Sequence, residues 1–188
     1  MQKSKYVFVI TGAAGSGKTT VANYLRERYH MHRVITHTTR LPRPGERDGV
    51  DYHFETSETM KKLHLLEQVT YDQSQYGSSL EGLEEGWRQG QNDVVVLDTA
   101  GAITYHQRLH QQAVIIFLTV THMKSLAKRM TLRGDKIDAV KSRLQSKEYH
   151  RDLMLPPALK GVAHVVTNDQ WENTKKQIDA IVKQIITV

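Results

Sequence analysis

The residues between Gly12 and Thr19 have the types and the spacing that bind phosphate. They read Gly12-Ala13-Ala14-Gly15-Ser16-Gly17-Lys18-Thr19 and fit the pattern G-x-x-x-x-G-K-[ST]. Such glycines let successive backbone N–H groups turn inward at a helix N-terminus and form a nest for an anion. Lys18 would reach the β- and γ-phosphates, and the Thr19 hydroxyl would bind Mg²⁺. An apolar run before the motif and a helical pattern after it favour a nucleoside triphosphate site over a glycine turn with a surface lysine.

A second stretch, residues 36–54, gathers cationic side chains in a stiff loop. Its sequence is THTTRLPRPGERDGVDYHF, which places Arg40, Arg43 and Arg47 within eight residues and holds half of the chain's four prolines. A solvated surface turn has a similar composition. Guanidinium groups also bind phosphate through paired hydrogen bonds, and proline reduces the entropy lost when they close on a ligand. We interpret this loop as the site for the phosphate of a second nucleotide, the phosphoryl acceptor.

Asp98 ends the apolar run VVVLD, where a metal-associated acid belongs in a protein with a phosphate-binding loop. Its carboxylate could hold the water shell of the metal or orient arginines. The alternative is that Asp98 caps the N-terminus of a helix after it. Thr19 and Asp98 are therefore the predicted contacts of Mg²⁺.

The elements that must position these residues alternate between strand and helix. Apolar runs predict strands at 6–11, 32–37, 65–71, 93–98, 113–119 and 162–167. Amphipathic periods predict helices at 18–29, 80–89, 122–133, 135–149 and 170–186. This alternation predicts an α/β fold in which helices cover both faces of a parallel sheet, within one compact domain over residues 1–188.

Composition narrows the class of partner. The chain has 188 residues, a net charge of +6 and no cysteine, so disulfides and thiol chemistry are excluded. The excess of positive charge favours a polyanionic partner. Only Tyr149 adds an aromatic ring to the basic segment 121–160, which favours small phosphorylated ligands over nucleic acid. No apolar run is long enough to span a membrane, and the polar N-terminus does not read as a signal peptide, so we expect a cytoplasmic protein.

The loop at 36–54 also resembles a known family. The run Thr38-Thr39-Arg40-x-Pro42-Arg43-x-Gly45-Glu46-x-x-Gly49-x-Asp51-Tyr52-x-Phe54 is similar to the acceptor signature of guanylate kinases, and the resemblance extends from the phosphate-binding loop to Asn168-Asp169. It implies a P-loop kinase domain with an acceptor-binding insertion at about 37–90 and a lid at about 133–150. The implied reaction transfers the γ-phosphoryl group of MgATP to GMP or dGMP, in a monomer or homo-oligomer that binds neither nucleic acid nor membrane.

The resemblance also implies roles for single residues. The residues that match the grip on the GMP phosphate are Arg40, Arg43, Tyr52 and Tyr76. Glu67 matches the acceptor for guanine N1–H and the 2-amino group, although it could be an ordinary acid at a strand edge. The hydroxyl groups of Thr36 and Ser78 match positions that face guanine, and Asp98 is assigned to the same acceptor site.

On the donor side, the resemblance implies that Arg129, Arg133 and Arg143 belong to a lid over ATP and act in catalysis with Lys18 and Arg40. Asn168 matches a position near the adenine, and as a helix-capping residue it would look the same. The family usually continues after its first acid with a second acid and a Gln-Gly pair, where this chain has Thr99-Ala100-Gly101. Two alternatives stay open. One is a kinase for another phosphorylated acceptor, such as a ribose bisphosphate, and the other is a binding module without catalysis.

Overall fold

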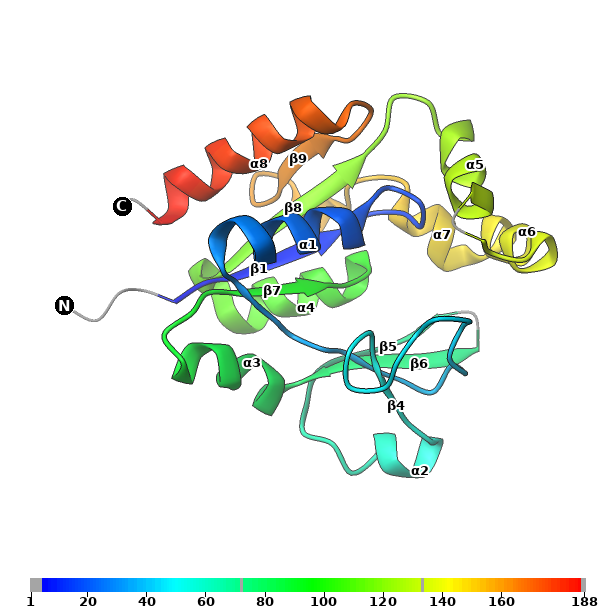
Figure 1. The fold of residues 1–188 in the computed structure, drawn as a ribbon, viewed down its shortest axis with the longest axis horizontal. Coiled ribbons are helices and arrows are strands. Elements are labelled where there is room, and N and C mark those ends of the chain that lie inside the picture. The colour runs from blue at the N-terminus through cyan, green and yellow to red at the C-terminus, as the bar shows by residue number, and fades with distance from the viewer. Residues whose placement is uncertain (1–4, 72, 133, 187–188) are drawn as a thin grey trace.

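A computed structural model describes residues 5–71, 73–132 and 134–186 of the chain. Its larger sheet has five parallel strands in the order β2-β7-β1-β8-β9 (Figure 1). These are β1 (Val7–Thr11), β2 (His32–Arg33), β7 (Asp93–Val96), β8 (Ala113–Thr119) and β9 (His164–Thr167). Because β1 lies at the centre, the loop after it leaves the carboxyl edge of the sheet between β7 and β8, which is where parallel sheets bind ligands.

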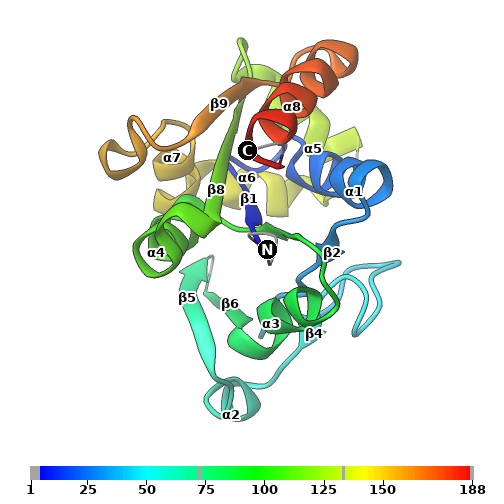
Figure 2. The ribbon, with the colours of Figure 1, turned by 90° about the vertical axis from the view of Figure 1, so that its left-hand side faces the viewer.

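Alternate residues of β1 face opposite sides of this sheet, as the two-residue period of a strand requires. Phe8 and Ile10 pack in one side-chain cluster, Val7 and Val9 pack in another, and all four are completely buried. The helices that cover the two faces are α1 (Lys18–Tyr29) and α8 (Trp171–Ile186) on one side and α4 (Thr99–Leu109) on the other (Figure 2). The predicted parallel sheet with helices on both faces is confirmed.

A second sheet of four strands, in the order β4-β3-β6-β5, lies below the first in Figure 1. Its strands β5 and β6 form an antiparallel hairpin, and β3 joins this hairpin to β4. Leu66 of β5 shares a buried cluster with Val7 and Val9, so the two sheets pack on a common core. The elements of this part are β3 (His37–Thr38), β4 (His53–Phe54), α2 (Ser57–Met60), β5 (Leu65–Tyr71), β6 (Ser74–Ser79) and α3 (Leu80–Arg88).

The predicted strand at 32–37 is wrong as a single element, because the chain passes from one sheet to the other within it. The backbone N–H of Val34 still bonds to the carbonyl of Val94, beside the larger sheet. Two residues later the carbonyl of Thr36 accepts from the N–H of His53, beside the smaller sheet. The apolar alternation is continuous across this change of partner, and so it does not reveal it.

The predicted helix at 135–149 is also wrong as one element. It is divided into α6 (Ile137–Gln145) and α7 (Lys147–Asp152), after α5 (Lys124–Leu132). Ser146 ends α6 and caps α7, since its hydroxyl accepts from the N–H of Tyr149 at 3.2 Å. Val140 and Tyr149 pack in one cluster with Ala13, so α6 and α7 are anchored beside the loop that follows β1.

Short 3₁₀ helices, η1 (His110–Gln112) and η2 (Pro157–Leu159), precede β8 and β9. Within the described ranges, none of the helices combines the length and the apolar composition needed to cross a lipid bilayer.

Candidate phosphoryl-transfer site

The loop between β1 and α1 has the shape that its glycines permit. Gly12, Gly15 and Gly17 have φ angles of 125°, 82° and 97°, a region that favours glycine. Space also requires glycine here, because a Cβ on Gly15 would lie 2.7 Å from the carbonyl oxygen of Leu126. A Cβ on Gly12 would collide with the carbonyl oxygen of Leu118. The loop is therefore held tightly between β8 and α5.

Lys18, the first residue of α1, folds back over this loop. Its ammonium group donates to the carbonyl oxygens of Gly12 at 2.6 Å and Ala13 at 3.0 Å. Thr19 follows in the first turn of the helix and is exposed. The backbone N–H groups at a helix N-terminus carry a partial positive charge that attracts phosphate. The cationic ammonium and the helix end thus favour an anion at the same place.

Asn168 fixes the far side of the loop. Its side-chain amide donates to the carbonyl oxygen of Ser16 at 2.8 Å and accepts from the Thr174 hydroxyl at 2.9 Å. Its backbone carbonyl accepts from the guanidinium group of Arg129 at 2.9 Å. Asn168 is buried and lies before α8, so the structure shows a loop anchor rather than a helix cap. The predicted contact with adenine stays a prediction.

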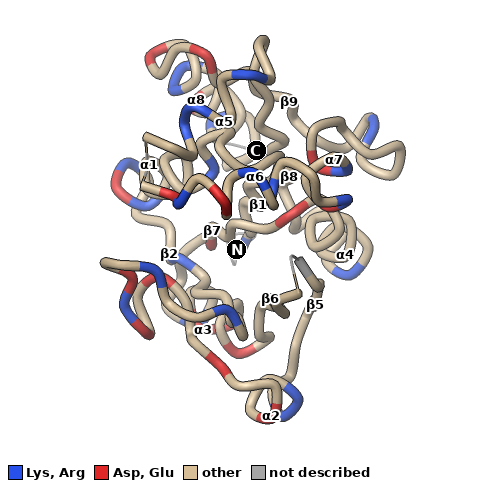
Figure 3. Tube along the Cα trace, turned by 90° about the vertical axis from the view of Figure 1, so that its right-hand side faces the viewer, with Lys and Arg blue, Asp and Glu red and all other residues tan. Residues whose placement is uncertain are grey.

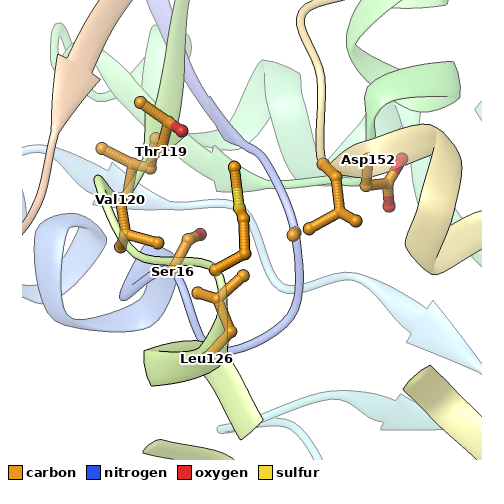
Figure 4. Close-up of a pocket in the computed structure, with 9 residues that line it drawn as sticks. Ser16, Thr119, Val120, Leu126 and Asp152 are labelled. Carbon is orange, nitrogen blue, oxygen red and sulfur yellow. The ribbon is translucent and has the colours of Figure 1, made fainter.

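A narrow pocket lies behind the phosphate-binding loop (Figure 4). Ser16 lies among Thr119, Val120 and Leu126 in this view, and Asp152 of α7 lies on the opposite side of the pocket. Most of its lining is apolar. This region is the packing contact between the loop and the helices α5–α7.

In the loop at residues 36–54, the carboxylate of Glu46 holds Arg40 in place. One terminal nitrogen of its guanidinium group donates to both carboxylate oxygens of Glu46, at 3.0 and 2.9 Å, and the other donates to the carbonyl of Leu41 at 2.6 Å. Glu46 also accepts from the backbone N–H of Arg43 at 2.7 Å and lies 3.8 Å from its guanidinium group. One carboxylate therefore orients both arginines. Figure 3 shows Lys and Arg on this part of the chain and on the part that carries α5–α7.

Aromatic rings support this pair of arginines. The Arg40 guanidinium lies over the ring of Tyr52, 5.4 Å from its centroid, and the rings of Tyr52 and Tyr76 pack edge to face at 6.2 Å. Burial raises the pKa of Tyr52, with a smaller contribution from Tyr76. Its hydroxyl therefore keeps its proton and can donate to a phosphate. The structure brings Arg40, Arg43, Tyr52 and Tyr76 together beside the end of β3, where Thr38 pairs with Tyr76 of β6.

Glu67 lies inside the protein and not at an exposed strand edge. It is only 5% exposed, and its Oε2 atom has no hydrogen-bond partner among the described residues. Burial raises the pKa of Glu67 to about 7, with a further increase from Asp98, while hydrogen bonds from Ser78 oppose the increase. Ser78 faces Glu67 across the β5–β6 hairpin, and Thr36, which precedes β3, is also buried. The Oε2 atom of Glu67 is therefore a buried hydrogen-bond acceptor to which a bound base could donate.

Asp98 caps a helix and also holds an arginine. One carboxylate oxygen accepts from the backbone N–H of Gly101 at 2.8 Å, which caps α4, and the other accepts from Arg151 of α7 at 2.6 Å. Arg151 also donates to the hydroxyl of Thr99 and to the buried carboxylate of Asp152. The capping alternative and the orientation of an arginine are thus confirmed.

Comparison with known proteins assigns the family. The sequence model described as guanylate kinase matches residues 4–185. The chain belongs to the guanylate kinase family. A curated guanylate kinase from Synechococcus sp. (strain JA-3-3Ab) is 32% identical over 179 residues, which cover 92% of this chain and 80% of the relative. One from Thermus thermophilus is 35% identical over 148 residues, covering 76% of this chain and 67% of the relative.

Solved structures agree with this assignment. The crystal structure of guanylate kinase from Anaplasma phagocytophilum has a TM-score of 0.75 and 25% identity, and covers 100% of this chain and 90% of its own. A gluconokinase from Sinorhizobium meliloti 1021 has a TM-score of 0.53 at 14% identity, and the alignment covers 97% of this chain and 95% of that one. This second likeness concerns the fold alone.

The structure places only some of the arginines that we predicted to form a lid in this member of the guanylate kinase family. Arg129 lies on α5 and bonds to the carbonyl of Asn168, as described above. Arg143 lies near the end of α6 and is half-buried. Arg133 lies outside the described residues. The catalytic roles of all three stay predictions.

Three residues at the site were missed by the sequence analysis: Arg151 and the buried Tyr105 and Asp152. Arg151 belongs to the basic segment 121–160, which was a signal, but its partner Asp98 is 53 positions away. Tyr105 gives no signal in the sequence, since a tyrosine in a helix is usually a packing residue.

Proposed function

We propose that this chain transfers the γ-phosphoryl group of ATP to GMP, or to dGMP, and releases ADP and GDP. The observation that carries the choice of acceptor is the buried, unpartnered carboxylate oxygen of Glu67. Guanine presents N1–H and a 2-amino group, two donors that a carboxylate can accept. Adenine presents a bare N1 and would leave the buried oxygen unpaired, so it is rejected.

The catalytic mechanism needs no covalent intermediate. The acceptor phosphate oxygen is already an anionic nucleophile, and the protein has to align it with the γ-phosphate. In the proposal, the backbone of residues 12–17 and the ammonium of Lys18 hold the donor phosphates. Arg40 and Arg43 hold the acceptor phosphate, and the lid arginines reduce the negative charge on the transferring group.

Mg²⁺ belongs to the proposal as part of MgATP. Among the described residues no cluster of three or more His, Cys, Asp or Glu could hold an ion. This fits a cation that is bound mainly by phosphate oxygens and water, as Mg²⁺ is in kinases. The exposed hydroxyl of Thr19, beside Lys18, is the residue that fits as a protein ligand. Both oxygens of Asp98 already accept hydrogen bonds, so a water-mediated contact fits Asp98 better than direct coordination.

An acceptor panel tests the assignment. ADP release would be measured with GMP, dGMP, AMP, UMP and CMP at fixed MgATP. We expect turnover with GMP and dGMP and little with AMP. Faster turnover with a different acceptor would favour the kinase for another phosphorylated compound. ATP binding without turnover of any acceptor would favour the binding module.

Glu67→Gln tests the residue-level part of the proposal. The amide offers one acceptor oxygen and places N–H donors against the donors of guanine. We expect the KM for GMP to rise about tenfold to hundredfold, since hydrogen bonds to charged groups are worth about 1.5–3 kcal/mol. The KM for ATP should stay within about twofold of the wild type. An unchanged ratio of GMP to AMP turnover would mean that guanine is read elsewhere.

The predicted partners are the two nucleotides alone, without nucleic acid or membrane. The expectations of a monomer or homo-oligomer and of a cytoplasmic location stay predictions.

A further inference from the structure

Tyr105 is a buried polar residue for which the proposed reaction has no use. It lies in α4, its exposed fraction is 0%, and it packs in the same cluster as Leu66 and Val95. Its hydroxyl donates to the side-chain oxygen of Ser78 at 2.8 Å, across 27 positions of sequence. A phenylalanine would fill the same space without the need for a partner. The hydroxyl group is therefore the feature that requires an explanation.

Ser78 lies between Tyr105 and the carboxylate of Glu67, which we propose to bind the guanine base. It is completely buried and pairs with Glu67 in the register of the β5–β6 hairpin. The two side chains therefore lie on the same face of the hairpin, and the polar groups of Ser78 oppose the rise in the pKa of Glu67. A serine hydroxyl has one proton. Since Tyr105 donates to Ser78, the single proton of Ser78 is available to the neighbouring ionised carboxylate of Glu67, which can only accept.

We propose that Tyr105 is a positioning residue for acceptor selection: its hydroxyl directs the single proton of Ser78 to Glu67 and so holds the unpartnered Oε2 atom of Glu67 ready for the donors of the acceptor base. The inference rests on the proposed role of Glu67 as the residue that reads guanine.

The charged groups around Glu67 make the effect of the Tyr105–Ser78–Glu67 connection on its ionisation measurable. Asp98, which caps α4, is a like charge that raises the pKa of Glu67, and Arg151 of α7 partly neutralises Asp98. Burial raises the pKa of Tyr105, its hydrogen bond with Ser78 opposes this increase, and the charges of Glu67 and Asp93 add to it. The net shift is upward, so Tyr105 keeps its proton when Glu67 ionises. Donation from Tyr105 polarises the Ser78 hydroxyl and strengthens its bond to the ionised carboxylate. Tyr105 therefore favours the charged form of Glu67.

The test is the pH profile of kcat/KM for GMP in the Tyr105→Phe variant. Loss of one hydrogen bond should move the acidic limb upward by about 0.5 to 1 pH unit. At pH 7 the KM for GMP should rise about twofold to fivefold, and by pH 9, where Glu67 is ionised in both proteins, the two should converge. kcat and the KM for ATP should not change. The second ionisation of the GMP phosphate affects both profiles equally and cancels in the comparison.

The matched control is Tyr29→Phe. Tyr29 also donates to a carboxylate, that of Asp179 at 2.6 Å, but it lies on the α1–α8 side of the sheet. Its pH profile should equal that of the wild type. A Tyr105→Phe variant that lowers kcat or thermal stability without moving the acidic limb would reduce Tyr105 to a packing residue and overturn the inference.

Two further variants separate this inference from the proposed function. In Ser78→Ala the connection is already broken, so adding Tyr105→Phe should change the KM for GMP by less than about twofold; independent, multiplicative effects would contradict the connection. If Glu67→Gln leaves the KM for GMP unchanged, the proposed reading of guanine fails. If Glu67→Gln raises this KM while Tyr105→Phe leaves the profile in place, only the role of Tyr105 fails.

Discussion

Arg40 shows how a single guanidinium group is prepared for its ligand. One of its terminal nitrogens donates to Glu46 and the other to the carbonyl of Leu41. Its Nε atom is buried, and none of the described residues accepts a hydrogen bond from it. The ring of Tyr52 supports its flat face. The group is therefore oriented before the acceptor arrives, which lowers the entropy lost on binding.

Arg40→Lys should separate orientation from charge. Lysine keeps the positive charge but has neither the planar fork nor the stacking surface. We expect the KM for GMP to rise about tenfold to hundredfold, from the loss of charge-assisted hydrogen bonds, and the KM for ATP to change less than about twofold. Arg47→Lys, an exposed exchange in the same loop, is the control. Equal KM values for Arg40→Lys and the wild type would show that charge alone suffices.

At the scale of elements, one glycine sets how closely α3 approaches the larger sheet. A Cβ on Gly86 would collide with the carboxylate of Asp93 on β7 and lie 2.6 Å from Nδ1 of His32 on β2. At Gly82, in the same helix, a Cβ would meet only the Ser79 hydroxyl at 3.1 Å and a methyl group of Val34 at 3.5 Å. Only the first of these glycines is required by packing.

Gly86→Ala should therefore destabilise the protein by about 1–3 kcal/mol, the usual cost of an overpacked core. Gly82→Ala gains about 1 kcal/mol of helix propensity, which offsets its mild contact and leaves stability nearly unchanged. Urea denaturation followed by circular dichroism measures both. A Gly86→Ala variant as stable as Gly82→Ala would show that α3 can move away from β7 at no cost.

The burial and length of each element decide whether it can be predicted from the sequence. The strands β1, β7 and β8 are continuous apolar runs because they are buried on both faces, and such runs are visible. The strand β6 reads SQYGSS, which has no apolar face, and β3 and β4 have two residues each. Ser146 divides α6 from α7 by capping, which periodicity does not detect.

The candidate site divides along similar lines. Residues that belong to a local motif, such as those around Lys18 and Arg40, can be predicted because all residues of the motif lie within one short segment of the sequence. Tyr105 and Arg151 reach the site through contacts between segments that are 27 and 53 positions apart. Only the packing of α4 and α7 against the sheet creates those contacts, and no pattern within one segment records them.

At the scale of the whole molecule, the end of the larger sheet near Gly86 contains a buried acid. Asp93 is completely buried, and its Oδ1 atom lies 2.8 Å from Nδ1 of His32. Its Oδ2 atom has no hydrogen-bond partner within the part of the chain that the structure describes. Burial raises the pKa of Asp93 to about 8, against an opposing effect of Lys5. The folded protein therefore binds this proton more tightly than the unfolded chain does.

Asp93→Asn should reveal this proton as a pH dependence of stability. In the wild type the contribution of Asp93 is most favourable below pH 4 and is lost as the pH rises from about 4 to about 8, by at most about 1.4 kcal/mol per unit. Asparagine carries no charge and removes the dependence. The free energy of unfolding of the variant minus that of the wild type should therefore rise between pH 5 and pH 8 in urea titrations. A difference that stays constant would mean that Asp93 is ionised throughout.

The pairing of β3 with β6 has a consequence for how acceptor choice can change over evolution. His37 lies opposite Gly77 and Thr38 opposite Tyr76, so the chain enters and leaves the smaller sheet along two adjacent strands. The stretch 37–79 thus starts and ends on two neighbouring strands, and the phosphate-binding loop precedes it in the sequence. A recombination event that exchanged this contiguous stretch would replace Arg40, Arg43, Tyr52, Glu67 and Tyr76 together and leave the phosphate-binding loop unchanged.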